Sequence, residues 1–282
     1  MSRPAFPSAA RLVIGQIRYQ LLLFWRVPIA LFFTLLFPLM VLVLFNAIFG
    51  DTTVQTERGN WPIRQFYTGG LAVFTAVSAT YTNLANMVPI RRDEGVLKRW
   101  RGTPLPTWVY VAGAIGSSVV IALFGVLVML TLGVVAYGLE IDPAKLPAAA
   151  VTFVVGVGAF AALGMAVAAL VPSASSASAV ANATILPLAF VSNVFVSLEQ
   201  PPRWLALVGD VFPLKPFVTS FQDAFNPLVP APAFNWPELA FIAGWGLVGL
   251  LVAVRRFRWE PSAGGPTRRR RSRRAPEVTA DA

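Results

Sequence analysis

The densest cluster of charged side chains outside the C-terminal tail lies between residues 91 and 101. It mixes bases with acids, in the order Arg91, Arg92, Asp93, Glu94, Lys98, Arg99 and Arg101. The acids precede Lys98 and Arg99 by four or five residues, a spacing that stabilises a short helix through attraction between opposite charges. A charged helix between two apolar stretches can bind a partner and transmit its motion. The residues alone are equally compatible with a solvated loop that only sets the topology.

A second group of polar residues lies inside apolar stretches. They recur at helical spacing in two places, first at Thr75, Ser78, Thr82 and Asn86, and then at Asn182 and Asn193. Each set is predicted to occupy one face of its helix. These groups either line a polar translocation path or hydrogen-bond one helix to another, at about 0.6 kcal/mol per bond. The second interpretation is favoured, because small hydroxyl residues are common at helix contacts.

The sequence contains no cysteine and no histidine, which excludes disulfides, thiolate nucleophiles and imidazole acid–base chemistry. We predict no metal site and no catalytic residue, so the chain is not expected to be an enzyme. It also lacks the G-x-x-x-x-G-K-[ST] phosphate-binding loop, so no cofactor is expected in this chain and ATP must bind elsewhere. Asp210 and Asp223 are expected at helix caps or on solvated faces.

Six long apolar stretches must position these polar groups. The chain has 282 residues, of which 56% are hydrophobic and 13% are charged, against about 25% charged residues in a soluble domain. Each stretch is near the ~20 residues that cross a ~30 Å hydrocarbon layer, and lipid requires such segments to be helical. We therefore predict an all-α membrane protein with six transmembrane helices, at Val27–Phe49, Phe66–Val88, Val109–Leu132, Ala148–Val171, Ala177–Leu198 and Leu239–Val254.

The segments around these spans complete the predicted domain organisation. Residues 1–26 form a cytosolic N-terminus with an interfacial helix at Arg11–Arg26, whose apolar residues recur at helical spacing. Residues 27–258 form the transmembrane domain, with the charged cytosolic loop at 90–106. An apolar, proline-broken outer segment at 199–237 is predicted to hold two short amphipathic helices that re-enter the outer leaflet or lie on it.

Positive charge is unevenly distributed along the chain. An even number of spans places both termini on one side, and this side receives most of the 23 Lys and Arg residues. Positively charged loops stay cytoplasmic, so both termini are predicted to face the cytosol. Residues 259–282 form a basic disordered tail, and its arginines between Arg268 and Arg274 are expected to contact anionic membrane lipid and no nucleic acid.

Three stretches of the sequence are distinctive when taken together. They are Gln16-Ile17-Arg18 with Arg26-Val27-Pro28 and Phe37-Pro38; Glu94-Gly95-Val96-Leu97-Lys98-Arg99 with Thr103-Pro104-Leu105; and Phe190-Val191-Ser192-Asn193-Val194-Phe195 with Leu198-Glu199-Gln200-Pro201-Pro202-Arg203-Trp204 and Phe212-Pro213-Leu214. In this order on six spans they resemble the permease subunits of the ABC-2 type (type V) exporters, in particular the daunorubicin and multidrug-efflux branch. The resemblance extends to about Arg258.

The resemblance implies a partner and an assembly. Permeases of this family pair as dimers, and each binds an ABC ATPase subunit that holds ATP and Mg. The loop helix and the N-terminal interfacial helix would dock on that ATPase, and the substrate usually passes between the two permeases. The residues expected to couple the chain to the ATPase are Asp93, Glu94, Gly95, Lys98 and Arg99, together with Arg101.

We therefore predict the permease of an ATP-driven exporter in a bacterial cytoplasmic (inner) membrane. The apolar spans favour small hydrophobic substrates such as drugs, lipids or natural products. An ABC-2 permease that exports a polysaccharide or glycolipid is an alternative. An ion-coupled secondary transporter is a weaker alternative, because such coupling needs intramembrane titratable groups and the sequence places no carboxylate in a span core.

Overall fold

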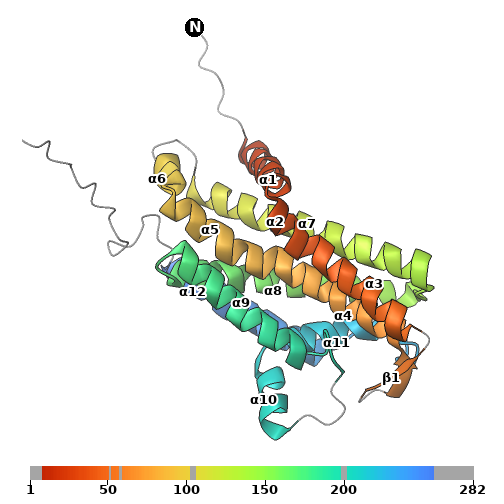
Figure 1. Ribbon diagram of the computed structural model, residues 1–282. Coiled ribbons are helices and arrows are strands. Elements are labelled where there is room, and N and C mark those ends of the chain that lie inside the picture. The colour runs from red at the N-terminus through yellow and green to blue at the C-terminus, as the bar shows by residue number, and fades with distance from the viewer. Residues whose placement is uncertain (1–7, 51, 57–58, 102–105, 198–201, 257–282) are drawn as a thin grey trace, which may run out of the picture.

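The computed structural model describes residues 8–50, 52–56, 59–101, 106–197 and 202–256, apart from the side chains of residues 98, 100, 101 and 107. These residues form an elongated bundle of helices (Figure 1). In chain order the elements are α1 (Ala9–Trp25), α2 (Pro28–Leu31), η1 (Phe32–Leu36), α3 (Phe37–Phe49), β1 (Thr53–Thr56), β2 (Gly59–Pro62), α4 (Ile63–Val77), η2 (Ser78–Thr82), α5 (Asn83–Asp93), α6 (Val96–Arg101), α7 (Thr107–Tyr137), η3 (Pro143–Lys145), α8 (Leu146–Leu170), α9 (Ala174–Val191), α10 (Arg203–Val211), α11 (Leu214–Asp223) and α12 (Trp236–Arg256).

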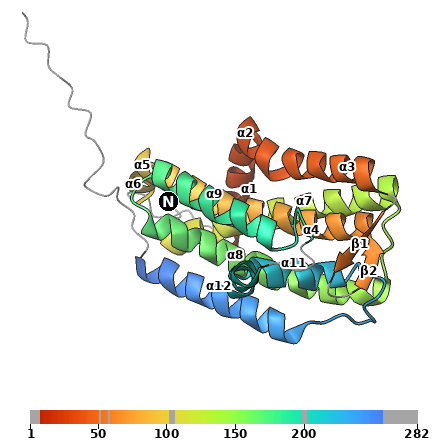
Figure 2. The same cartoon turned by 60° about the horizontal axis from the view of Figure 1, so that its bottom comes forward.

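Five helical stretches among the described residues are long and apolar enough to cross a membrane. They are Pro28–Phe49, Trp108–Tyr137, Pro143–Leu170, Ala174–Val191 and Trp236–Arg256. All five overlap predicted spans, so the chain is a multi-pass membrane protein of the all-α class. Figure 2 shows α3 and α12 on opposite sides of the bundle, with the other long helices between them.

The remaining predicted span, Phe66–Val88, belongs to the central helix of the bundle. It lies within α4, η2 and α5, which follow one another without a break over 15, 5 and 11 residues. Nearly every residue of α4 is buried. Because this helix contacts protein on most sides, it carries more polar residues than the lipid-facing helices, and it is less apolar than the five stretches above. The count of six spans therefore stays a prediction.

The N-terminal helix α1 packs on the bundle. A β-carbon placed on Gly116 of α7 would lie 2.7 Å from Cδ1 of Ile17 in α1, so the two helices are in direct contact. The chain then turns at α2 into the first span (Figure 2). The predicted N-terminal helix is thus confirmed as a helix, and its position in the membrane interface stays a prediction.

A π-helical turn precedes Pro38 in the first span. Pro38 has no N–H to give to the carbonyl of Thr34, and the turn before it, η1, is π-helical. There the Phe37 N–H donates to the carbonyl of Phe32, five residues earlier. The span continues as α3 to Phe49.

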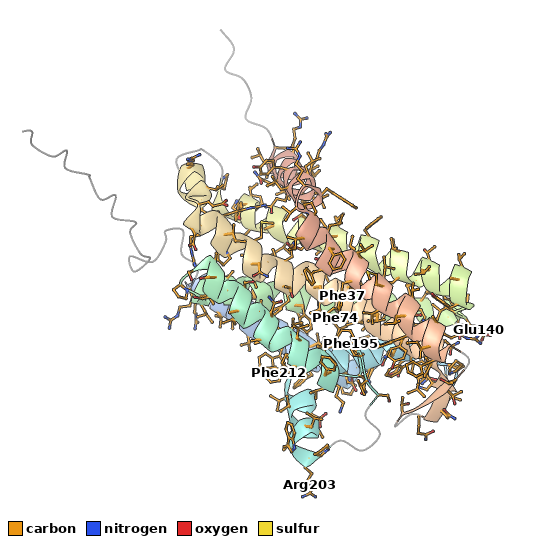
Figure 3. All side chains as sticks on the ribbon, in the orientation of Figure 1. Phe37, Phe74, Glu140, Phe195, Arg203 and Phe212 are labelled. Atoms are coloured by element: carbon orange, nitrogen blue, oxygen red, sulfur yellow. The ribbon has the colours of Figure 1, made fainter. Side chains whose placement is uncertain are left out.

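The outer segment contains the two helices that the sequence predicts. Helix α10 exposes Trp204 and Leu207, and it projects from the bundle with Arg203 at its tip (Figure 3). Helix α11 lies inside the bundle, where Phe217 packs against Gly156 of α8 and stacks on Phe160 at 5.9 Å. The re-entry of these two helices into the outer leaflet stays a prediction.

The polar segment between residues 50 and 62 forms an antiparallel pair of strands that the sequence analysis did not predict. Val54 of β1 pairs with Trp61 of β2, and Trp61 is buried. The strands lie at one end of the bundle, and α6 and the N-terminus of α9 lie at the other (Figure 1). We refer to these as the β-hairpin end and the α6 end.

Candidate functional site

The last turn of α5 carries three consecutive charged residues, Arg91, Arg92 and Asp93, which we call the charged clamp. The predicted second span ended at Val88 and treated these residues as loop. The predicted start of the loop at residue 90 was wrong, because the helix continues to Asp93 and buries both arginines. Each member of the clamp bonds to a different part of the bundle.

Arg91 connects α5 to the N-terminal helix. Its Nη1 donates to Oε1 of Gln20 in α1 at 2.8 Å. Both side chains are buried, at 6% exposure each. A buried arginine is costly unless it is hydrogen-bonded, so this contact fixes α1 to the end of α5.

Arg92 connects α5 to the C-terminal end of α8. Its Nη2 donates to the carbonyl of Val171 at 2.7 Å, and its Nη1 donates to the carbonyl of Ala168 at 3.3 Å. The last carbonyls of a helix have no partner within the helix, and a cation is favourable beside them. Arg92 is 3% exposed, so it serves as a buried C-terminal cap for α8.

Asp93 connects α5 to the N-terminal end of α9. Its Oδ2 accepts a hydrogen bond from the N–H of Ala174, the first residue of α9, at 2.7 Å. The first N–H groups of a helix also lack partners, and an anion is favourable there. The Asp93 carboxylate lies 3.9 Å from Nε of Arg92. Two neighbouring residues of opposite charge therefore hold the two helix ends of the α8–α9 turn.

The predicted coupling residues follow the clamp directly. Glu94 and Arg99 are exposed, and Gly95 has a φ of +73°, a left-handed conformation that allows the chain to turn sharply from α5 into α6. Leu97 is fully buried and anchors α6 in a cluster that includes Val88 and Tyr110. The side chains of Lys98 and Arg101, and residues Thr103, Pro104 and Leu105, lie outside the described part of the chain.

The polar face of the central helix divides into a buried and a half-buried part. Thr75 is buried, donates to the carbonyl of Leu71 in its own helix at 2.8 Å, and packs against Gly125 of α7. Ser78 is also buried. Farther toward the α6 end, Thr82 and Asn86 are half-buried, and the Thr82 Oγ1 and Asn86 Oδ1 atoms have no hydrogen-bond partner.

Hydrogen bonds between helices come from residues beside this polar face. The Tyr81 hydroxyl lies 2.7 Å from Oγ1 of Thr184 in α9, and Nδ2 of Asn83 donates to Oγ of Ser118 in α7 at 3.2 Å. Sequence reasoning missed both pairs. Helical spacing identified the polar face, but the partners lie on helices whose orientation the sequence does not reveal.

The two asparagines assigned to the fifth span do not share a helix. Asn182 lies on an exposed face of α9, with Ser178 one turn earlier on the same face. Helix α9 ends at Val191 and not at Leu198 as predicted, and Asn193 lies beyond it with a φ of +59°. The predicted common face of Asn182 and Asn193 was therefore wrong.

A second polar cluster lies around α11 on the β-hairpin side of the molecule. Nε2 of Gln222 donates to the carbonyl of Phe66 at 3.0 Å, and Nζ of Lys145 donates to the carbonyl of Asn226 at 2.8 Å. Asp223 is 3% exposed, so the prediction that it lies on a solvated face was wrong. Asp210 is exposed as predicted, paired with Lys215 at 2.8 Å.

The fold and these contacts define a multi-pass helical membrane protein with a charged helix connection at one end of its bundle. The chain belongs to the ABC-2 type transporter family, whose model matches residues 13–226. It is 26% identical over 231 residues to the daunorubicin resistance ABC transporter permease protein DrrB1 of Streptomyces coeruleorubidus, over 79% of this chain and 78% of that protein. The family predicted from the three sequence stretches is confirmed, and the chain is a membrane subunit of an ABC transporter.

Proposed function

We propose that this chain is the permease of a bacterial exporter that moves hydrophobic drugs, lipids or natural products out of the cell. The relative's name refers to resistance to daunorubicin, and the lipid-facing helices are strongly apolar. A separate ATPase subunit, which would bind ATP and Mg, supplies the energy. The α6 end faces the cytosol in this proposal, because Arg91, Arg92, Arg99 and the arginines that end α12 all lie there.

The ATPase docks on α6 and the residues around it. Buried Leu97 holds α6 against the bundle, whereas Glu94 and Arg99 are exposed and available to a partner. Lys98 and Arg101 are part of the same proposed contact. A mixed-charge surface of this kind steers a partner and sets its register more than it adds affinity.

The charged clamp is the observation on which the coupling mechanism rests. A force on α6 reaches the end of α5 through only Glu94 and Gly95. From there, hydrogen bonds transmit the force from Arg91 to α1, from Arg92 to the end of α8, and from Asp93 to the start of α9. Closure of the ATPase would therefore move this end of the central helix together with the attached ends of α1, α8 and α9. Half-buried Thr82 and Asn86, with their unpaired polar atoms, and exposed Asn182 are the proposed lining of the path. Of the other predicted path residues, Thr75 and Ser78 are buried and Asn193 lies beyond α9, so they are not part of this proposal.

A second copy of the permease is proposed to cover α9. Ser178 and Asn182 expose polar groups on a helix that is otherwise apolar enough to face lipid. A polar group in hydrocarbon finds no hydrogen-bond partner, so a facing helix from a second permease, or a substrate between the two, would satisfy these residues.

A charge reversal on the exposed surface tests the proposed docking site. We expect Glu94→Arg to lower substrate-stimulated ATP hydrolysis in the complex reconstituted with its ATPase. A lost surface contact worth about 1 kcal/mol corresponds to a roughly fivefold weaker association. Glu140→Arg is the matched control, because Glu140 is also exposed but lies at the β-hairpin end (Figure 3). Equal ATPase stimulation in both variants would rule out α6 as the docking site.

A further inference from the structure

An apolar groove runs between α8, α9 and α12. Its volume is about 260 Å³, and the turn at Phe212–Leu214 closes one end. Figure 3 shows Phe212 on the same side of the bundle as α10. Phe160, Val167 and Val248 contribute to its walls. Because the three surrounding helices are candidate membrane spans, the open side of the groove faces hydrocarbon.

The polar groups that line the groove are already hydrogen-bonded. Tyr81 and Thr184 bond to each other at 2.7 Å, and Thr184 also donates to the carbonyl of Val180 at 2.8 Å. Nε1 of Trp245 donates to the carbonyl of Val211 at 3.0 Å. Because these polar groups already have partners and the rest of the lining is apolar, the groove suits a hydrocarbon chain.

The length of the groove matches one leaflet. Its wall on α8 extends from Phe160 to Leu170, which corresponds to roughly 15 Å at the helical rise of 1.5 Å per residue. That is about half of the ~30 Å hydrocarbon layer. Leu170 is the last residue of α8, so the open end of the groove lies near the α6 end of the bundle.

Two arginines lie beyond this open end. Trp245, Val248 and Val252 line the groove from α12 at helical spacing. Arg255 and Arg256 follow Val252 by three and four residues, so they continue the same face of α12. Both are exposed. The site therefore combines an apolar channel one leaflet long with positive charge at headgroup level.

We propose that this groove binds one acyl chain of an anionic phospholipid, with the phosphate held by Arg255 and Arg256. An acyl chain is in equally apolar surroundings in the groove and in the bilayer, so selectivity must come from the headgroup. The proposal requires only that the chain spans a membrane, so it does not depend on export or on an ATPase.

Fluorescence quenching by brominated lipid tests the proposal on the purified full-length chain. The protein is reconstituted into phosphatidylcholine vesicles with increasing fractions of phosphatidylglycerol that carries bromine on its acyl chains. Trp245 is the reporter, and its contribution is the difference in quenching between the unchanged chain and Trp245→Phe. We expect half-maximal quenching at an about tenfold lower lipid fraction for brominated phosphatidylglycerol than for brominated phosphatidylcholine, since two arginines favour the anion.

Two pairs of variants decide the result. The double variant Arg255→Gln with Arg256→Gln should abolish the tenfold preference, whereas Arg11→Gln with Arg18→Gln removes two exposed charges from α1 and should preserve it. Val167→Phe fills the groove and should reduce quenching of Trp245, whereas Val154→Phe, at an exposed position of α8, should not.

Three outcomes would overturn the proposal. These are equal quenching by the two brominated lipids, a preference that survives in the α12 double variant, and identical behaviour of the two phenylalanine variants. If Val167→Phe does not fold, as judged by gel filtration, the arginine pair decides alone. Because the measurement uses neither ATP nor a transport substrate, failure here is distinct from failure of the proposed exporter function.

Discussion

Alanine at position 164 should force two helices apart, whereas alanine at position 158 should not. Both glycines lie in the interior of α8. A β-carbon on Gly164 would lie 2.7 Å from the backbone oxygen of Tyr81 and 2.9 Å from its Cα. A β-carbon on Gly158 would meet nothing within 4 Å. At Gly164 the obstruction is backbone within η2, so it cannot be relieved by a change of rotamer.

The difference between the two variants isolates the cost of this overlap. Both substitutions change helix propensity by the same amount, about 1 kcal/mol, so that contribution cancels in the comparison. Additional atoms in a close-packed interior cost about 1–3 kcal/mol. With roughly 2–4 °C of melting temperature per kcal/mol in a chain of this size class, we expect Gly164→Ala to melt roughly 5 °C below Gly158→Ala.

The assay is the thermal stability of each purified variant in one detergent, followed by the fraction that stays monodisperse on gel filtration after heating. Gly164→Ala should lose monodispersity at the lower temperature. Equal melting temperatures, or a higher one for Gly164→Ala, would contradict the close approach of α8 to Tyr81. They would also remove the basis for placing α8 directly against the central helix at this point.

Three further predictions concern the clamp and the proposed dimer. Asp93→Ala leaves the Ala174 N–H at the start of α9 without its acceptor and should cost about 1 kcal/mol, seen as a lower melting temperature, while Asp93→Asn should retain part of the stability. Arg92→Ala leaves carbonyls at the end of α8 unpaired and should lower the free energy of unfolding by about 2 kcal/mol. The exposed control Arg99→Ala should change it by no more than about 0.5 kcal/mol. A greater loss of stability in Arg99→Ala than in Arg92→Ala would contradict the buried cap. The chain has no native cysteine, so Asn182→Cys should form a disulfide-linked dimer on oxidation in membranes. Val254→Cys, at an exposed position of α12, should remain monomeric on a non-reducing gel. Monomers in both variants would refute a dimer through α9.

In the coupling region, local sequence patterns predicted the secondary structure but not the tertiary contacts. The mixed charges around Asp93 and Glu94 predicted a short helix after the second span, and α6 confirms a helix there. Asp93 was predicted to contact a partner, but its carboxylate caps α9 at a position 81 residues away in the chain. Spacing rules relate residues within one helix, and they contain no information about a contact across such a separation.

The polar residues inside the spans show the same limit. A helical repeat predicted Thr75, Ser78, Thr82 and Asn86 on one face of the central helix, but the turn at Ser78–Thr82 is π-helical, and the regular repeat does not hold there. It could not distinguish the buried Thr75 from the half-buried Asn86, because burial depends on which neighbouring helix approaches. The error at Asn193 has a different origin. The apolar stretch continues to Leu198, but α9 already ends at Val191, and the apolar residues alone do not show where the helix ends.

The sequence by itself determined that this chain is a helical membrane protein, where most of its spans lie, and to which family it belongs. The length of an apolar stretch, the placement of charges and short motifs can all be read locally in the sequence. A long apolar stretch in a bilayer must be helical, because lipid offers its backbone no hydrogen-bond partner. Only the tertiary structure decided that Arg92 and Asp93 hold the α8–α9 turn, that Asp223 is buried, and that an apolar groove ends near Arg255. Each of these follows from the packing of helices that are distant in sequence, because the partner of a polar group is set by the neighbour that it meets.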